Sequence, residues 1–141
     1  VDGLAIGAGY GEDSGSTAAG VNEVDSTHMT AFANYSFGPA TFGYQKSEIN
    51  HGKQGTQSEE TDAWGIAFNI NENLSVSYGE RTVHYADHST TAAVDEEGEG
   101  IAVAYTMGSM KIAGNKNEVS SNGGTSGVSD EMTEIALSFA F

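Results

Sequence analysis

The last segment of the chain alternates strictly between two kinds of side chain. From Glu134 to Phe141, apolar residues occupy every second position, and small or polar residues occupy the positions between them. Alternation with a period of two is typical of a β-strand whose two faces meet different environments. Phe141, the last residue, belongs to the apolar set, although chain ends usually fray in water. The pattern predicts a strand whose apolar face contacts lipid.

Turn signals and polar segments divide the rest of the chain at a regular interval of roughly 35 residues, which indicates one supersecondary unit per interval. The short turn signals are Asp2-Gly3, Gly38-Pro39, Asn71-Glu72-Asn73 and Gly108-Ser109. Longer segments rich in Gly, Ser, Thr, Asn and acids lie between them and are predicted as loops: 11–27, 50–59, 87–95 and 120–129. This order predicts four β-hairpins in one unit that covers residues 1–141.

Eight strands are predicted between these breaks: 4–10, 29–37, 41–49, 61–70, 74–85, 100–107, 110–119 and 132–141. Several approach the roughly 9–11 residues of a tilted membrane-spanning strand. Tight turns at one edge and long loops at the other are typical of outer-membrane barrels. Two irregularities are expected: a bulge near 79–81, where the apolar positions change from even to odd numbers, and a loss of alternation after Lys46.

A soluble antiparallel sandwich would alternate in the same way, but the placement of particular residue types favours lipid. One interfacial aromatic girdle is predicted near the short turns, made of Tyr35, Phe37, Phe42, Phe68, Tyr78, Tyr105, Phe139 and Phe141. Trp64 and Tyr85 are predicted to mark the opposite girdle. The face without large apolar residues is mostly Gly, Ala, Ser and Asn, and all acids except Asp2 and Glu72 lie toward the long loops.

Composition excludes several classes of function. The 141 residues carry a formal charge of -15, which excludes nucleic acid as a partner because phosphate binding needs a basic surface. There are no cysteines, and therefore no disulfide framework or thiol nucleophile. No Gly-x-Ser-x-Gly motif or phosphate loop occurs, so no enzyme activity is expected. No apolar run approaches the roughly 20 residues of a membrane-spanning helix.

Several segments resemble a known family when they are taken together in their order and spacing: 34–39, 73–79, 100–110, 122–127 and 133–141. They are similar to the C-terminal half of a Gram-negative general diffusion porin of the alphaproteobacterial type. The resemblance runs from about Leu4 to the end of the chain. The family's constriction loop belongs to the other half, so its residues have no counterpart here.

The resemblance implies an all-β, antiparallel transmembrane β-barrel, with eight strands here as about half of a sixteen-stranded barrel. It also implies a homotrimer in the bacterial outer membrane, with long loops extracellular and short turns periplasmic. The barrel would form a water-filled channel for passive diffusion of small hydrophilic solutes and ions. The partners it implies are outer-membrane lipid, lipopolysaccharide and the remaining barrel strands outside this chain.

Two alternative functions are kept. One is a small closed outer-membrane barrel that displays its acidic loops as an adhesin or receptor, and a less favoured one is a barrel enzyme acting on lipids. An eight-stranded barrel fills its interior with side chains. The predicted inner face of Ala, Gly, Ser and Asn would leave such a barrel underpacked, which favours a wider barrel.

Candidate pore-lining residues are Lys46, Arg81, Lys111 and Asn115. Lys111 and Asn115 have the opposite parity to Met110 and Ile112, and a lysine on a pore wall tunes ion permeation. Arg81 has a second interpretation, as a rim residue that neutralises neighbouring acids, and this interpretation is preferred.

Acidic clusters at 59–62 and 95–99 are expected at the loop rim, where they would bias permeation toward cations. Oxygen-rich clusters suit Ca²⁺ or Mg²⁺, and the weak candidates for such a site are Asp95, Glu96, Glu97 and Glu99. A solvated charged loop is the preferred interpretation of these acids, so no cofactor is required.

Overall fold

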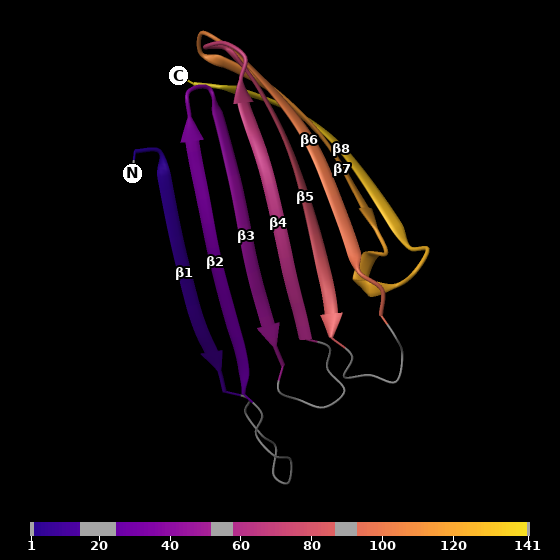
Figure 1. Cartoon of the computed structure of the whole chain (residues 1–141). Coiled ribbons are helices and arrows are strands. Elements are labelled where there is room, and N and C mark those ends of the chain that lie inside the picture. The colour runs from indigo at the N-terminus through magenta and orange to yellow at the C-terminus, as the bar shows by residue number, and fades with distance from the viewer. Residues whose placement is uncertain (1, 15–24, 52–57, 87–92, 141) are drawn as a thin grey trace.

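The computed structural model describes residues 2–14, 25–51, 58–86 and 93–140. Its strands are β1 (Leu4–Asp13), β2 (Ser26–Phe37), β3 (Ala40–Asn50), β4 (Ser58–Asn69), β5 (Leu74–Ala86), β6 (Glu96–Met107), β7 (Met110–Ser120) and β8 (Ser129–Phe139), and a short 3-10 helix, η1 (Asn122–Gly124), precedes β8. All eight predicted strands are present in the predicted order. The prediction of an all-β antiparallel fold is therefore confirmed (Figure 1).

Each strand pairs with its neighbours in sequence, in the order β1 to β8 of a single antiparallel sheet. At one end of the sheet, Gly38 and Gly108 have φ angles of +55° and +60°, a region that glycine enters without steric cost. In the turn between β4 and β5, the Asn71 side chain accepts hydrogen bonds from the backbone N–H groups of Asn73 and Leu74, both at 2.9 Å. These turns form the short-turn end, and the other connections form the long-loop end (Figure 1).

The predicted bulge near 79–81 is wrong, and the loss of apolar alternation after Lys46 does not interrupt the strand pairing. Gly79 pairs with Gly65 and with Gly100 in a register that continues unbroken on both sides, so β5 carries no bulge. The register of β3 is also continuous through Lys46. In β5 the apolar residues change from even-numbered to odd-numbered positions because they move from one face of the sheet to the other along the strand. Val76 and Tyr78 lie on one face of the sheet, and Val83 lies on the other.

The strands begin earlier than predicted at the long-loop end. β4 begins at Ser58 and β6 at Glu96, so the acids expected at the loop rim, at 59–62 and 96–99, are strand residues. Consecutive residues of a strand point to opposite faces. The clusters are therefore divided between the two faces of the sheet instead of forming one loop rim.

The register separates the residues into an apolar face and a polar face. Ile66, Tyr78 and Ile101 are cross-strand neighbours on the apolar face, while Ala67, Ser77 and Ala102 are neighbours on the polar face. Residues directly opposite each other in an antiparallel pair share a face. The same rule assigns every paired strand residue to one of the two faces.

The sheet has almost no hydrophobic core. Within the described residues, Ala40 and Val83 are the only buried apolar residues, whereas Ile6 is 73% and Ile135 is 79% exposed. Along β6 the apolar-face residues are exposed, and the Gly and Ala residues between them are half-buried. All the described strands belong to one sheet, so no second sheet covers the apolar side chains as it would in a sandwich.

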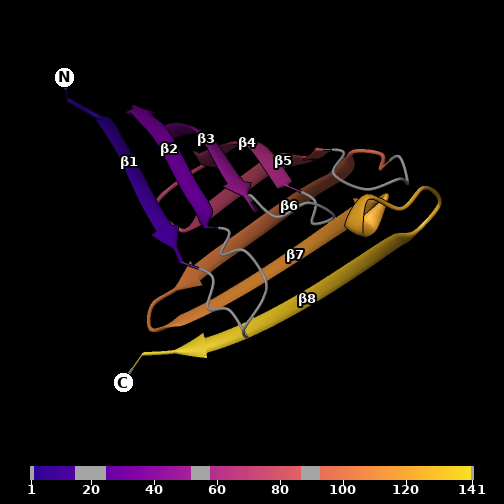
Figure 2. The same ribbon diagram turned by 90° about the horizontal axis from the view of Figure 1, so that it is seen from below.

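The sheet is bent, and its two edges are open. Figure 2 shows the last strands turning back from the line of the first ones. The lower exposure of the polar face in β6 indicates that this face lies on the inside of the bend.

β1 pairs with β2 and β8 pairs with β7, but these edge strands do not pair with each other. The eight strands therefore form an open sheet and not the small closed barrel of the alternative hypothesis. Among the described residues, no helix is long and apolar enough to cross a membrane.

Candidate functional site

Large apolar side chains cover the half of the apolar face nearest the short turns. We call this surface the apolar band; it comprises Leu4, Ile6, Tyr35, Phe37, Phe42, Ile66, Phe68, Leu74, Val76, Ile101, Val103, Tyr105, Met107, Ile112, Ile135, Leu137 and Phe139. Its members come from all eight strands. Large exposed apolar patches on a protein surface mark sites of contact with lipid or with partners.

Four aromatic residues end the band on the side of the long loops, and we call them the aromatic row: Tyr10, Tyr44, Trp64 and Tyr78. Trp64 and Tyr78 are in edge contact, with ring centroids 5.8 Å apart. All four residues combine an apolar ring with a polar tip. Such residues favour positions where one end is dry and the other is wet.

Each polar tip in the aromatic row donates a hydrogen bond to a carboxylate, which lies at the same level for Trp64 and farther from the short turns for the three tyrosines. The Trp64 Nε1–H donates to Glu80 at 3.1 Å, and the Tyr78 hydroxyl donates to Glu80 at 2.6 Å and to Glu99 at 2.8 Å. The remaining pairs are Tyr10 with Glu12 and Tyr44 with Asp62. The row is thus a boundary between the apolar band and a zone of charged residues.

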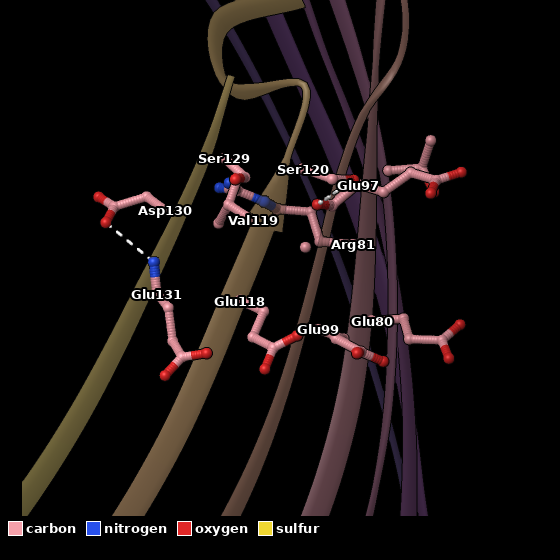
Figure 3. Close-up of a pocket in the computed structure, with 12 residues that line it drawn as sticks. Glu80, Arg81, Glu97, Glu99, Glu118, Val119, Ser120, Ser129, Asp130 and Glu131 are labelled. Atoms are coloured by element: carbon pink, nitrogen blue, oxygen red, sulfur yellow. Dashed lines mark hydrogen bonds between the residues drawn. The ribbon is translucent and has the colours of Figure 1, made fainter. Parts of the chain in front are cut away.

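That zone, the charged band, contains a row of four glutamates directly opposite one another on β5 to β8: Glu80, Glu99, Glu118 and Glu131. Figure 3 shows this part of the sheet, where these residues line a shallow hollow. Like charges directly opposite on neighbouring strands are destabilising. Lys116 offsets part of this repulsion because its ammonium group pairs with Glu118 and, at 3.2 Å, with Glu131.

The charged band lies outside the apolar band, and its ion pairs are exposed. The neighbouring Lys116 ammonium lowers the pKa of the Glu118 carboxyl through a hydrogen bond. His84 Nδ1 lies 3.0 Å from an Asp95 oxygen. Exposed pairs of this kind contribute little to stability, so the band is better explained by what it contacts.

Lys46, one of the predicted pore-lining residues, lies on the apolar face and not on the polar face with the other three. Its partners across the sheet are Ala31 and Asp62, and its ammonium group pairs with Glu60 and Asp62. The continuous register of β3 places Lys46 in the charged band, on the same face as Tyr44. The other three candidates, Arg81, Lys111 and Asn115, are on the polar face as predicted.

The polar face is lined mainly by small residues. Four glycines lie directly opposite one another across β3 to β6: Gly43, Gly65, Gly79 and Gly100. A Cβ atom on Gly79 would lie 3.0 Å from the Trp64 carbonyl oxygen. The strands approach too closely here for a side chain on Gly79, and the Asn34 and Asn117 side chains lie over Gly43 and Gly100. On β7, Asn115 donates to Glu134 at 3.4 Å and accepts from Asn117 at 2.9 Å.

Glu96 is the most enclosed acid of the polar face, with 6% of its surface exposed. Its carboxylate accepts hydrogen bonds from Arg81, from the Tyr85 hydroxyl at 3.2 Å and from the Gly123 N–H at 2.8 Å. Arg81 thus neutralises a neighbouring acid, in agreement with its preferred interpretation. Sequence reasoning placed Glu96 among metal candidates and missed these donors.

The acids proposed for a divalent cation do not come together. Glu97 and Glu99 lie on the apolar face, and Glu96 lies on the polar face. Among the described residues, no group of three or more His, Cys, Asp or Glu side chains is arranged to hold a metal ion. The carboxylate oxygens of Glu96 are directed to protein donors.

The predicted girdles are partly reassigned. Phe37, Phe42, Tyr105 and Phe139 lie in the apolar band toward the short turns, and Phe141 is outside the described residues. Tyr78 belongs to the aromatic row at the other edge of the band, with Trp64. Tyr85 is on the polar face opposite Glu59 and belongs to neither girdle. Tyr10 and Tyr44 were missed because their cross-strand level depends on the register.

Comparisons of the chain with protein-family models, with curated proteins and with solved structures find no match.

Proposed function

We propose that this chain forms part of a porin-like transmembrane β-barrel, a water-filled channel in the bacterial outer membrane for passive diffusion of small hydrophilic solutes and ions. The observation that carries the proposal is the exposed apolar band, bounded by aromatic residues whose polar tips bond to carboxylates. Burying apolar surface is worth about 25 cal/mol per Å², and the described sheet leaves this surface uncovered. Hydrocarbon chains would cover it.

The uncharged stretch of the apolar face on one strand, β2, agrees with this assignment. On β2, the apolar-face positions from Met29 to Phe37 carry no charge. Strands rise about 3.3 Å per residue, so this stretch is about 26 Å long. That length, before allowance for strand tilt, is comparable with the roughly 25 Å apolar zone of outer-membrane barrels. The aromatic row would lie at the interface, and the charged band would lie among the headgroups of outer-membrane lipid and lipopolysaccharide.

The open edges support a barrel larger than these eight strands. Backbone groups cannot stay unpaired in lipid, so both edges must pair with further strands. β1 runs toward the long-loop end and β8 runs away from it (Figure 1). Further hairpins could therefore join both edges and keep the sheet antiparallel throughout. A total of about sixteen strands, with the remainder outside this chain, would leave a wet lumen along the small residues of the polar face.

Transport in such a channel needs no chemical step. Water fills the space beside the polar face, the width of the barrel limits solute size, and fixed charges bias which ions enter. The described polar face carries the acids Asp13, Glu59, Glu96, Asp130 and Glu134 against Arg81 and Lys111. This excess of negative charge would favour cations, and the mechanism needs no enzymatic residue or cofactor.

A planar-bilayer recording of the purified protein tests this proposal. Stepwise conductance and a reversal potential that favours cations in a salt gradient are expected. A heat-sensitive oligomer band on a gel, which dissociates into single chains, is expected for the proposed homotrimer. Complete absence of conductance from protein that is folded in detergent would overturn the channel function.

A further inference from the structure

The connection between β7 and β8, residues 121–128, lies over the polar face. It follows β7 in the chain, yet it contacts β6 and β5. The Gly123 N–H donates to Glu96 at 2.8 Å, and the Val94 N–H donates to the Gly124 carbonyl at 3.2 Å. A Cβ atom on Gly124 would lie 2.8 Å from the Tyr85 ring on β5. The connection therefore reaches across β6 to β5 at the long-loop end of the polar face.

The connection also has a compact structure of its own. The Gly124 N–H donates to the Ser121 carbonyl at 2.8 Å, the Asn122 N–H to Val128 at 3.0 Å and the Val128 N–H to Thr125 at 3.2 Å. Ser121 has a φ angle of +54° and Gly124 one of +71°. These contacts define a folded turn with one shape, so its position over the polar face is set by the structure of the turn and by its anchor.

Glu96 is that anchor. Its buried carboxylate joins Arg81 and Tyr85 of β5 to Gly123 of the connection. Val83, directly opposite Glu96 in the register, is 5% exposed. These two positions are the most buried on the described polar face and lie where the connection contacts the sheet. A buried carboxylate that loses its hydrogen-bond donors is costly, so Glu96 favours the position of the connection seen in the structure.

We propose that the β7–β8 connection is a constriction of the channel at the long-loop end, and that Glu96 is the positioning residue that holds it over the polar face. This inference rests on the proposed channel function. The constriction narrows the passage for solutes of every charge. It also keeps Arg81 paired, so that the guanidinium adds little positive charge to the passage.

The first test removes the charge of the anchor. Glu96→Gln keeps the shape of the side chain but weakens its bonds to Arg81 and Gly123 and leaves the Arg81 charge unpaired. We expect higher single-channel conductance and a reversal potential shifted toward anions. Glu97→Gln is the matched control because it makes the same charge change one residue away, on the opposite face. Equal behaviour of the two variants would overturn the proposal.

A second pair of variants moves the connection without changing any charge. Gly124→Ala places a methyl group against the Tyr85 ring, whereas Gly123→Ala meets no atom within 4 Å. Both glycines have positive φ angles, of +71° and +65°, so the backbone cost of the two substitutions is similar. Higher conductance is expected for Gly124→Ala alone. No difference between the two would contradict a constriction at this contact.

The third test needs no channel activity. The chain has no cysteine, and a Cβ atom on Gly124 would lie 3.3 Å from that of Ala93, near the roughly 3.5–4.5 Å of a disulfide. In the folded protein, Ala93→Cys with Gly124→Cys should lose both free thiols on mild oxidation with diamide. The pair Ala93→Cys with Gly123→Cys should retain them. Failure of the first pair to cross-link would refute the inward position of the connection. Cross-linking in protein that never conducts would instead refute the channel function and leave the geometry intact.

Discussion

The indole N–H of Trp64 donates to the carboxylate of Glu80, the residue directly opposite on β5, at 3.1 Å. Tyr78 donates to the same carboxylate at 2.6 Å. Two rings on neighbouring strands thus direct their polar tips to one side and their apolar bodies to the other. This arrangement suits an interface between hydrocarbon and water, and it separates the apolar band from the charged band.

A lysine on the apolar face should be far more costly than one on the polar face of the same strand. Val103→Lys places a charge near the middle of the apolar band, where outer-membrane barrels lose about 2–4 kcal/mol. Ala102→Lys is the matched control, because Ala102, the residue just before Val103, faces the proposed lumen. Urea unfolding in lipid vesicles measures the difference. Similar losses for both variants would contradict a lipid-facing band.

Two glycines of the polar face, one inside the aligned row and one outside it, should differ sharply in their tolerance of a side chain. Gly79→Ala brings a methyl group within 3.0 Å of the Trp64 carbonyl oxygen, a backbone atom that cannot rotate away. We expect a loss of roughly 1–3 kcal/mol, typical of overpacking. Gly98→Ala, on the same face, meets its nearest atom at 3.6 Å and should be tolerated. Thermal or urea unfolding of the two variants compares them directly, and equal stability would indicate that the register near Gly79 is wrong.

Lys116 should stabilise the sheet by a small amount that depends on salt and pH. It pairs with two members of the glutamate row, so Lys116→Gln should unfold at lower urea, most clearly at low ionic strength where charges are least screened. The pairing lowers the pKa of Glu118. Its contribution is therefore present above the ordinary pKa of a glutamate and is lost as the pH falls through the lowered value. A variant indistinguishable from the parent at neutral pH and low salt would refute this role.

Two lysines on opposite faces should have different effects on ion selectivity. Lys111 is on the polar face, so Lys111→Gln removes a positive charge from the proposed lumen and should increase the preference for cations. Lys46→Gln makes the same change on the apolar face and should leave the reversal potential unchanged. The measurement is the reversal potential across a bilayer in a salt gradient. A larger shift for Lys46→Gln would reverse the assignment of the faces.

The strands were predictable because their signals are local. Turn residues such as Gly38 and Gly108 punctuate the chain, and alternation identifies the segments between them. The strand starts were not predictable, because β4 begins with a serine followed by two glutamates and β6 begins with two glutamates, and these residues resemble loop residues. Pairing with a neighbouring strand extends the sheet through them.

The candidate site depends on the register, which alternation alone does not provide. The parity of Lys111 and Asn115 was enough to place them on the polar face. The level of Tyr78 beside Trp64, and the alignment of the four glutamates, follow only when every strand is paired. The inward fold of residues 121–128 had no signal in the sequence, because it depends on the long-range contact of Gly123 with Glu96.

Depth-dependent quenching of Trp64 tests the central claim, that lipid covers the apolar band. Trp64 is the only tryptophan in the chain and lies in the aromatic row, so its fluorescence reports from one known level. The folded protein is reconstituted in vesicles whose lipids carry a nitroxide either near the headgroup or deep in the acyl chain. We expect strong quenching by the shallow nitroxide and weaker quenching by the deep one. Fluorescence that neither lipid quenches, from protein that stays monodisperse in buffer without detergent, would contradict a membrane-facing sheet.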